Sequence, residues 1–173
     1  MSARLAIGTA AVLASVAALT RRRPGGSRWV DLQRSFDAME EAESRLEAAH
    51  AWLAERGGRP DPSGEVGMFG PAPLQHVILT ALVDEDGDPG VWIHWIEGTK
   101  GQSGAWELLR QALEAGGVTF AAGETIWERT FQGWMRHGFR EISAQKAEDL
   151  YHESGRDPDL DTDPANRYFM VYL

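Results

Sequence analysis

The sequence predicts a mixed α/β (α+β) domain in which strands and helices share one core. Two runs rich in β-branched and aromatic residues, His76–Val83 and Val91–Ile96, flank an acidic turn that contains Gly and Pro. This pattern is typical of an antiparallel hairpin. A glycine-rich turn and a helical pattern follow, and the chain closes on the apolar strand Arg167–Leu173. Alternating strand and helix patterns favour a sheet that is covered by helices.

An uncharged apolar segment, Leu5–Leu19, precedes the domain, and we expect an apolar N-terminal helix within residues 1–27. At about 1.5 Å per residue, its fifteen residues fall short of the roughly 30 Å bilayer core. Residues 5–19 therefore suit a membrane-contacting anchor, a cleaved signal peptide or a helix buried in a protein assembly. The basic block Arg21–Arg23 follows the segment, which would place the C-terminal body on the cytoplasmic side of a membrane.

A long amphipathic helix is predicted over Asp31–Arg56. Apolar or small residues recur every three or four positions on one stripe: Leu32, Phe36, Met39, Ala42, Leu46, Ala49 and Leu53. We expect this stripe to pack on the sheet of its own domain rather than on another helix. The Gly- and Pro-rich segment Arg59–Pro73 is predicted to be a loop.

Composition excludes several kinds of site. The chain has no cysteine, so disulfides, thiolate catalysis and cysteine-bound zinc are ruled out. We expect no metal site. The first thirty residues hold five of the 17 Lys and Arg residues and no acid, which leaves 12 basic against 26 acidic side chains. A body this acidic is not expected to bind nucleic acid.

The second half of the chain continues the alternation. The patterns predict a helix over Ala105–Ala115 and a strand over Val118–Ala121. A second helix is predicted to carry Trp127, Phe131 and Trp134 on one stripe, and an extended run follows from Phe139 to Ile142. The acidic segment Glu148–Asp163 is predicted to be a surface excursion. We expect that helical stripe, including Trp127, to pack in the core or a groove.

Three stretches in this order carry a family resemblance. Lys100–Leu109 is similar to the Arg/Gln-x-x-Gly-x-Gly/Ala turn and helix of acetyl-CoA-dependent acetyltransferases of the GNAT superfamily. Glu128–Arg140 is similar to the helix of that family that ends in Tyr-x-x-x-Gly-Phe. Tyr168–Leu173 is similar to the strand that closes the family's fold. The resemblance covers about 100 residues, 75–173 of a domain spanning 28–173. It implies a mostly antiparallel sheet flanked by helices. The N-terminal part does not match the family, which implies that this part is shortened or has a different structure.

The resemblance also implies a binding site for acetyl-CoA. In the family, backbone amides of the turn and of the following helix N-terminus hold the pyrophosphate. The corresponding residues here are Lys100, Gly101, Gln102, Ser103, Gly104 and Ala105. Lys100 takes the Arg/Gln place, and Ser103 and Ala105 take the places of the two glycines. Ser103 narrows the approach to the backbone at that step.

Acetyl transfer to an amine needs a base, and three residues are candidates: His94 and Glu97 on the second hairpin strand, and Glu124 after the next strand. Strict alternation would place His94 and Ile96 on one face of that strand and Trp95 and Glu97 on the other.

Trp134 stands where the family has its tyrosine acid. An indole N–H donates hydrogen bonds but does not transfer a proton near neutral pH. Tyr168 and Tyr172 are alternatives that would otherwise fill the last strand.

Three functions therefore remain open. The first is an acyltransferase that moves an acetyl group from acetyl-CoA to an amine whose identity the sequence does not give, in the cytoplasm or at a membrane. The second is a non-catalytic GNAT-fold assembly protein, such as a phage internal virion component. The third is a membrane-tethered binding domain.

Overall fold

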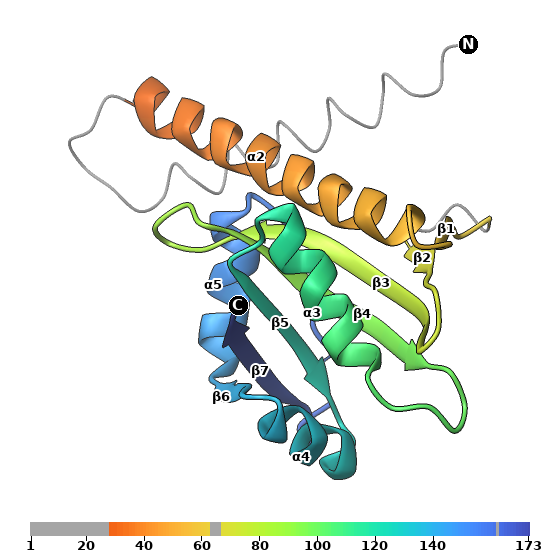
Figure 1. Ribbon diagram of the computed structural model, residues 1–173. Coiled ribbons are helices and arrows are strands. Elements are labelled where there is room, and N and C mark those ends of the chain that lie inside the picture. Colours follow the sequence, from red (N-terminus) through yellow and green to blue (C-terminus); the bar gives the residue numbers. More distant parts are fainter. Residues whose placement is uncertain (1–27, 63–66, 162) are drawn as a thin grey trace.

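The computed structural model describes residues 28–62, 67–161 and 163–173. Within them, seven strands form one sheet in the order β1-β2-β3-β4-β5-β7-β6. Helices α2 and α3 cover one face, α5 covers the other, and α4 lies at the end where β5 finishes (Figure 1). The elements are α2 (Arg28–Ala54), β1 (Arg59–Pro60), β2 (Gly67–Phe69), β3 (Leu74–Val83), β4 (Pro89–Gly98), α3 (Ala105–Gly116), β5 (Phe120–Thr125), α4 (Glu128–Arg136), β6 (Arg140–Ile142), α5 (Ala144–Glu153) and β7 (Arg167–Tyr172).

The sheet confirms the predicted class of mixed α/β with mostly antiparallel pairing. β3 and β4 form the expected hairpin, and β7 pairs antiparallel with both β5 and β6. The exception is the parallel pair β4 and β5, which α3 connects across one face. The predicted loop over Arg59–Pro73 is partly wrong, because β1 and β2 extend the sheet beyond β3. Such short strands escape pattern analysis because too few residues alternate.

The core on the α2 and α3 face confirms the predicted packing of α2 on its own domain. Ala42, Leu46, Ala49 and Leu53 are buried in it. The stripe is wrong at its start, because Phe36 is 41% exposed. The beginning of α2 extends past the sheet (Figure 1), and contact with the core starts at Ala38 and Met39.

The opposite face corrects the prediction of an acidic surface excursion over Glu148–Asp163. Helix α5 begins before this segment and includes its first residues, and Ala147, Leu150 and Tyr151 are buried against Trp92. Two serines fix its ends. The Ser143 side chain accepts a hydrogen bond from the Lys146 N–H, and the Ser154 hydroxyl accepts one from the Val83 N–H. The acidic residues of α5 concealed its short apolar stripe.

An aromatic cluster joins α3, α4 and β7. Trp134, Phe139 and Phe169 contact one another, and Trp106 contacts Trp134 and Phe139, with ring centroids 4.6–5.3 Å apart. Such stacked and edge-on pairs add to the free energy of burial. Trp127 does not join them, because it precedes the first residue of α4 and is 68% exposed. Of the two expected places, the core is therefore wrong for Trp127, which lines a groove instead.

The predicted apolar N-terminal helix at residues 5–19 lies outside the described residues. None of the described helices is long and apolar enough to cross a membrane.

Two glycines give opposite predictions for the same substitution. At Gly116, the last residue of α3, an added Cβ would lie 2.5 Å from the Arg45 carbonyl oxygen and 2.9 Å from the Ala49 nitrogen of α2. Backbone atoms cannot yield as a side chain can, so Gly116→Ala should lower the free energy of unfolding by about 1–3 kcal/mol. At Gly133 in α4 a Cβ meets nothing within 4 Å, so Gly133→Ala should raise it by about 0.5–1 kcal/mol. Urea denaturation measures both, and a free energy of unfolding that does not fall for Gly116→Ala would contradict the close approach of α2 and α3.

Candidate functional site

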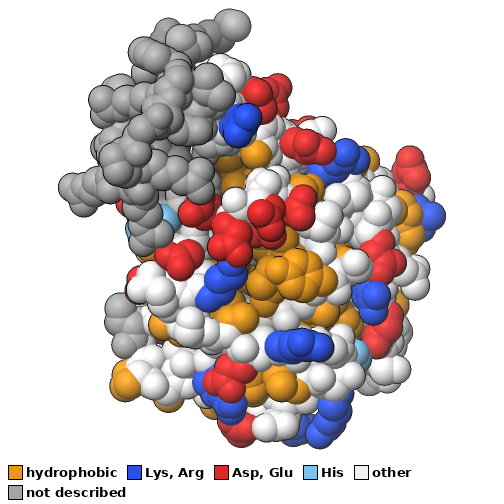
Figure 2. Space-filling model, turned by 90° about the vertical axis from the view of Figure 1, so that its left-hand side faces the viewer, with side chains coloured by type: hydrophobic (Ala, Val, Ile, Leu, Met, Phe, Trp, Pro, Cys, Tyr) orange, Lys and Arg blue, Asp and Glu red, His pale blue; other side chains and the backbone are white. Residues whose placement is uncertain are grey.

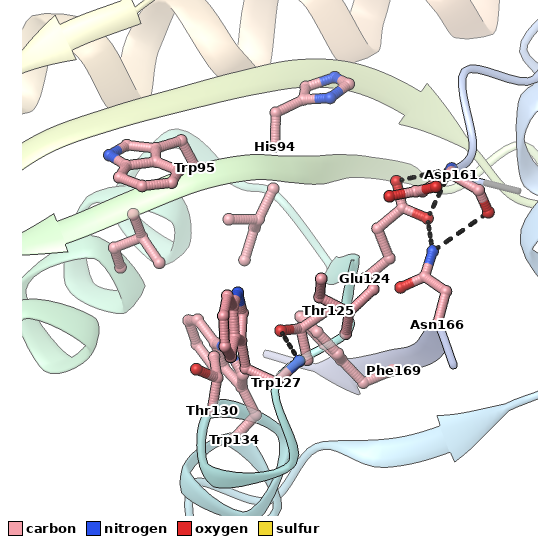
Figure 3. A pocket seen from close by; sticks show the side chains of 13 residues that line it. His94, Trp95, Glu124, Thr125, Trp127, Thr130, Trp134, Asp161, Asn166 and Phe169 are labelled. Carbon is pink, nitrogen blue, oxygen red and sulfur yellow. Dashed lines mark hydrogen bonds between the residues drawn. The ribbon is translucent and has the colours of Figure 1, made fainter. Parts of the chain in front are cut away.

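The site lies where β4 and β5 diverge. The two strands pair only from Gly90 to Ile93 and from Phe120 to Gly123, although β4 continues to Gly98 and β5 to Thr125. Beyond the last pair, one edge of β4 is not bonded to β5. A groove of about 360 Å³ lies at this split, lined by both strand ends, α4, β7 and the segment before β7 (Figure 3).

A β-bulge in β4 sets the direction of its side chains. Ile78 pairs with Trp95 and Leu79 with Ile93, so His94 is an extra residue without a partner in β3. The bulge increases the local twist and shifts the alternation by one residue. The expectation that His94 and Trp95 lie on opposite faces is therefore wrong. Both point to the same side of β4 and both line the groove (Figure 3).

Glu124 is the candidate base that the structure supports most directly. It lies at the end of β5 and lines the groove. Burial raises the pKa of its carboxyl above the ordinary value, although the hydrogen bonds from Asn166 and from the Asp161 backbone N–H act in the opposite direction. A carboxylate with a raised pKa is a better proton acceptor near neutral pH.

The other two candidate bases differ in position. His94 lines the groove, and its Nε2 hydrogen-bonds with the Thr80 hydroxyl at 2.9 Å. Burial lowers the pKa of its imidazole, which favours the neutral form. Glu97 is exposed, pairs in register with His76 and does not line the groove. The structure thus brings His94 and Glu124 to one groove and leaves Glu97 outside it.

Trp134 lines the groove but is only 8% exposed and belongs to the aromatic cluster. Its indole stacks on Phe169 with ring centroids 5.3 Å apart. The two tyrosines named as alternatives do not line the groove. The Tyr168 hydroxyl donates to the Asp161 carbonyl oxygen at 3.3 Å, and Tyr172 is exposed near the chain end. No tyrosine therefore stands in for an acid among the described groove residues.

The glycine-rich turn begins two residues beyond the end of β4. Gly101 and Gly104 adopt positive φ angles of 80° and 96°, a conformation that residues with a Cβ rarely take. No side chain caps the N-terminus of α3, which starts at Ala105. Its first N–H groups are therefore available to an anion. Lys100, Gln102 and Ser103 are exposed on the turn.

The segment before β7 contributes groove residues that the sequence did not single out. Asn166 Nδ2 donates to Glu124 Oε2 and to the Asp161 carbonyl oxygen, and both Asp161 and Asn166 line the groove. Successive side-chain turns hold this segment, since Asp161 Oδ1 accepts from the Asp163 N–H and Asp163 Oδ1 from the Ala165 N–H. The Asp-x-Asp-Pro-x-Asn pattern was the available signal for the turns, but it gave no contact with Glu124.

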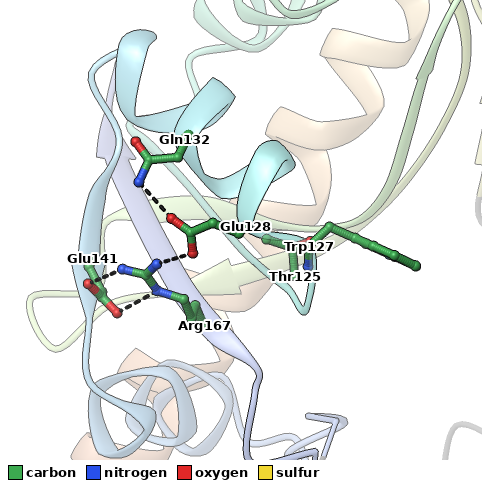
Figure 4. Close-up of polar contacts among 6 residues, drawn as sticks. All are labelled: Thr125, Trp127, Glu128, Gln132, Glu141 and Arg167. Atoms are coloured by element: carbon green, nitrogen blue, oxygen red, sulfur yellow. Dashed lines mark hydrogen bonds and ion pairs between the residues drawn. The ribbon is translucent and has the colours of Figure 1, made fainter.

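Arg167 fixes the start of α4 beside the groove (Figure 4). Its guanidinium donates two hydrogen bonds to Glu141 of β6, at 3.1 and 2.9 Å, and one to Glu128 in the first turn of α4. It also lies 3.8 Å above the Phe131 ring. The Thr125 hydroxyl accepts from the Trp127 N–H, which fixes the turn between β5 and α4.

Charges on the side of the molecule with α5 and β6 are mixed. Lys and Arg side chains are scattered among acidic ones around an exposed hydrophobic patch, without a continuous basic surface on this side (Figure 2). In the described parts of the chain, no group of three or more His, Asp and Glu residues is arranged to hold a metal ion.

No protein-family model matches the chain, and no curated protein matches it in sequence.

The hydrogen bond from Asn166 should control the pKa of Glu124. Asn166→Leu keeps the branched shape of the side chain but removes the donor that stabilises the charged carboxylate, so the pKa of Glu124 should rise further. NMR titration of ¹³C-labelled glutamate side chains measures it. Gln132→Leu, which removes an amide donor from Glu128 instead, should leave Glu124 unchanged. A pKa of Glu124 that stays constant or falls in Asn166→Leu would refute this contact.

Arg167 should make stability depend on pH. Hydrogen bonds from Gln132 and Arg167 lower the pKa of Glu128, and the hydrogen bonds from Arg167 lower that of Glu141. The stabilising contribution of Arg167 is therefore present near neutral pH and is lost as pH falls through those pKa values. Arg167→Met should therefore lower the melting temperature at pH 7 more than at pH 3. Arg110→Met, which breaks an exposed pair with Glu114 on α3, should change little at either pH. If Arg167→Met lowers the melting temperature by the same amount at pH 7 and at pH 3, this role of Arg167 is wrong.

Proposed function

We propose that the protein is an acyltransferase that moves an acetyl group from acetyl-CoA to an amine. The observation that carries the proposal is the groove between β4 and β5, which has Glu124 on its β5 side. The resemblance of the turn, helix and closing strand to GNAT acetyltransferases gives the same chemistry. The groove and the turn both lie where β4 ends, and ligands of open α/β sheets bind at such carboxyl ends of strands.

The residues of the turn fit a phosphate-bearing ligand. The N-terminus of α3 has no side-chain cap, and a Cβ at Gly101 would meet nothing within 4 Å, so the backbone there is open to approach. Lys100 adds one cation, although as a point charge without the fork of an arginine. These residues would hold the pyrophosphate of acetyl-CoA.

The free edge of β4 would hold the rest of the cofactor. Beyond Ile93, backbone N–H and C=O groups of β4 on that edge lack a strand partner in β5. An extended chain with amide groups satisfies such an edge by adding to it as a strand does. The same N–H groups are suited to donate to a carbonyl oxygen in the groove. Bound there, acetyl-CoA would supply an acetyl thioester, whose C–S bond breaks as the amine nitrogen forms an amide bond.

Glu124 would take the proton that the amine loses. Its raised pKa suits this role, and the hydrogen bonds from Asn166 and Asp161 keep its carboxylate in place. The groove is open to solvent, so water can return a proton to the departing thiolate. This arrangement needs no tyrosine acid.

One observation favours a second candidate, the non-catalytic GNAT-fold assembly module. Trp134 occupies the family's tyrosine position and packs in the aromatic cluster, where it supports the fold. A chain that had lost acyl transfer could keep such a residue for packing alone.

Binding of acetyl-CoA to the full-length chain tests the proposal. Ser103→Trp places a bulky side chain on the exposed turn before α3, and Gln111→Trp places the same side chain on an exposed position within α3. Isothermal titration should show saturable binding for the wild type and Gln111→Trp, with at least about tenfold weaker binding for Ser103→Trp. If the folded wild type does not bind, acyl transfer is wrong and the assembly module is favoured.

A further inference from the structure

Hydrogen-bond acceptors gather at one end of the groove. Asn166 Nδ2 is occupied by Glu124 and the Asp161 carbonyl, which fixes the amide so that its Oδ1 faces away from Glu124 (Figure 3). That Oδ1 atom is buried and has no hydrogen-bond partner in the described structure. A buried acceptor without a partner costs free energy until a donor reaches it. This end of the groove thus presents the Glu124 carboxylate to a donor, and the unpaired Asn166 oxygen beneath the surface adds negative potential there.

The groove also lacks positive charge. Its described lining contains Glu124 and Asp161 but neither Lys nor Arg. His94 is the remaining titratable side chain of the lining, and burial lowers its pKa, which keeps it neutral near pH 7. Arg156 and Asp159 also act on His94 from outside the groove, and the Arg156 guanidinium is paired with Glu43. A cationic ligand is therefore favoured and an anionic one is repelled.

Two tryptophans and an isoleucine provide the apolar part of the groove. Trp95 is 53% exposed, Trp127 is 68% exposed and Ile126 is 42% exposed, and all three line it. Trp95 stands on β4, and Trp127 extends from the start of α4 toward that strand (Figure 3). Three exposed large hydrophobic side chains at one groove are typical of a binding site. Indole faces also attract organic cations.

We propose that the groove binds a small primary amine with an aromatic skeleton, its ammonium group against Glu124 and its ring against Trp95 and Trp127. This inference rests on the proposed function, in which such an amine is the acceptor of the acetyl group. It excludes amino acids, because Glu124 and Asp161 would repel their carboxylate. It also excludes short polar amines, which would leave the two indoles without a contact.

The probe is 2-phenylethylamine, titrated into the full-length chain in the presence and in the absence of CoA. Matched comparators are phenylalanine, which adds a carboxylate, 2-phenylethanol, which removes the charge, and ethanolamine, which removes the ring. We expect saturable binding of 2-phenylethylamine, and at least about tenfold weaker binding of each comparator. The inference is overturned if 2-phenylethylamine binds neither with nor without CoA, or if phenylalanine binds as tightly as 2-phenylethylamine.

Three variants assign the contacts. Trp127→Ala should weaken binding of 2-phenylethylamine by about five- to tenfold, because it removes one indole face. Glu124→Gln should weaken it by about tenfold or more, because it removes the charge at nearly constant shape. Tyr172→Ala removes an aromatic side chain of similar exposure, 66%, that does not line the groove, and should leave binding unchanged. Equal effects of Trp127→Ala and Tyr172→Ala would overturn the assignment.

The outcome is separable from that of the proposed function. If acetyl-CoA binds and the amine does not, the acceptor class is wrong and acyl transfer stands. If the amine binds and acetyl-CoA does not, the groove recognises aromatic amines without transferring an acetyl group.

Discussion

The candidate site depends on the separation of two parallel strands. β4 and β5 are bonded to each other only as far as Ile93 and Gly123, and at this last pair a Cβ on Gly123 would lie 3.0 Å from the Ile93 carbonyl oxygen. The strands are thus in close contact immediately before they diverge. The bulge at His94 adds twist at the same point, which turns the end of β4 away from β5. The groove follows from these two local features.

The far side of the groove is held by residues that are distant in sequence. Asn166 reaches Glu124 from the segment before β7, and Arg167 ties β7 to β6 and to the first turn of α4. These contacts place a carboxylate on one side and the start of α4, with Trp127, on the other. The aromatic cluster beneath them supplies the rigid base on which α4 rests. The proposed chemistry therefore uses side chains from four elements that meet at one end of the sheet.

The packing of Trp134 indicates that this residue supports the fold rather than the chemistry. Its indole is packed among Trp106, Phe139 and Phe169, and this burial is sufficient to explain why a large aromatic residue stands there. The groove instead presents the Glu124 carboxylate, the His94 imidazole and two exposed indoles. A site with a carboxylate base and solvent access can transfer an acyl group to an amine without a tyrosine. The balance between enzyme and assembly module therefore depends on cofactor binding rather than on Trp134.

Local sequence patterns alone determined the hairpin, α3, α4, β7 and the glycine-rich turn, because each pattern reflects interactions among residues a few positions apart. They also named Glu124 and His94 among three candidate bases. Only the tertiary structure showed that Glu97 lies outside the groove and that His94 and Trp95 share one side of β4. The second result follows from the bulge in β4, which breaks the alternation on which the sequence argument relied. Only the tertiary structure showed that Trp127 is exposed. Only the tertiary structure, too, showed the contact between Asn166 and Glu124, since contacts between segments about forty residues apart have no periodic pattern in the chain.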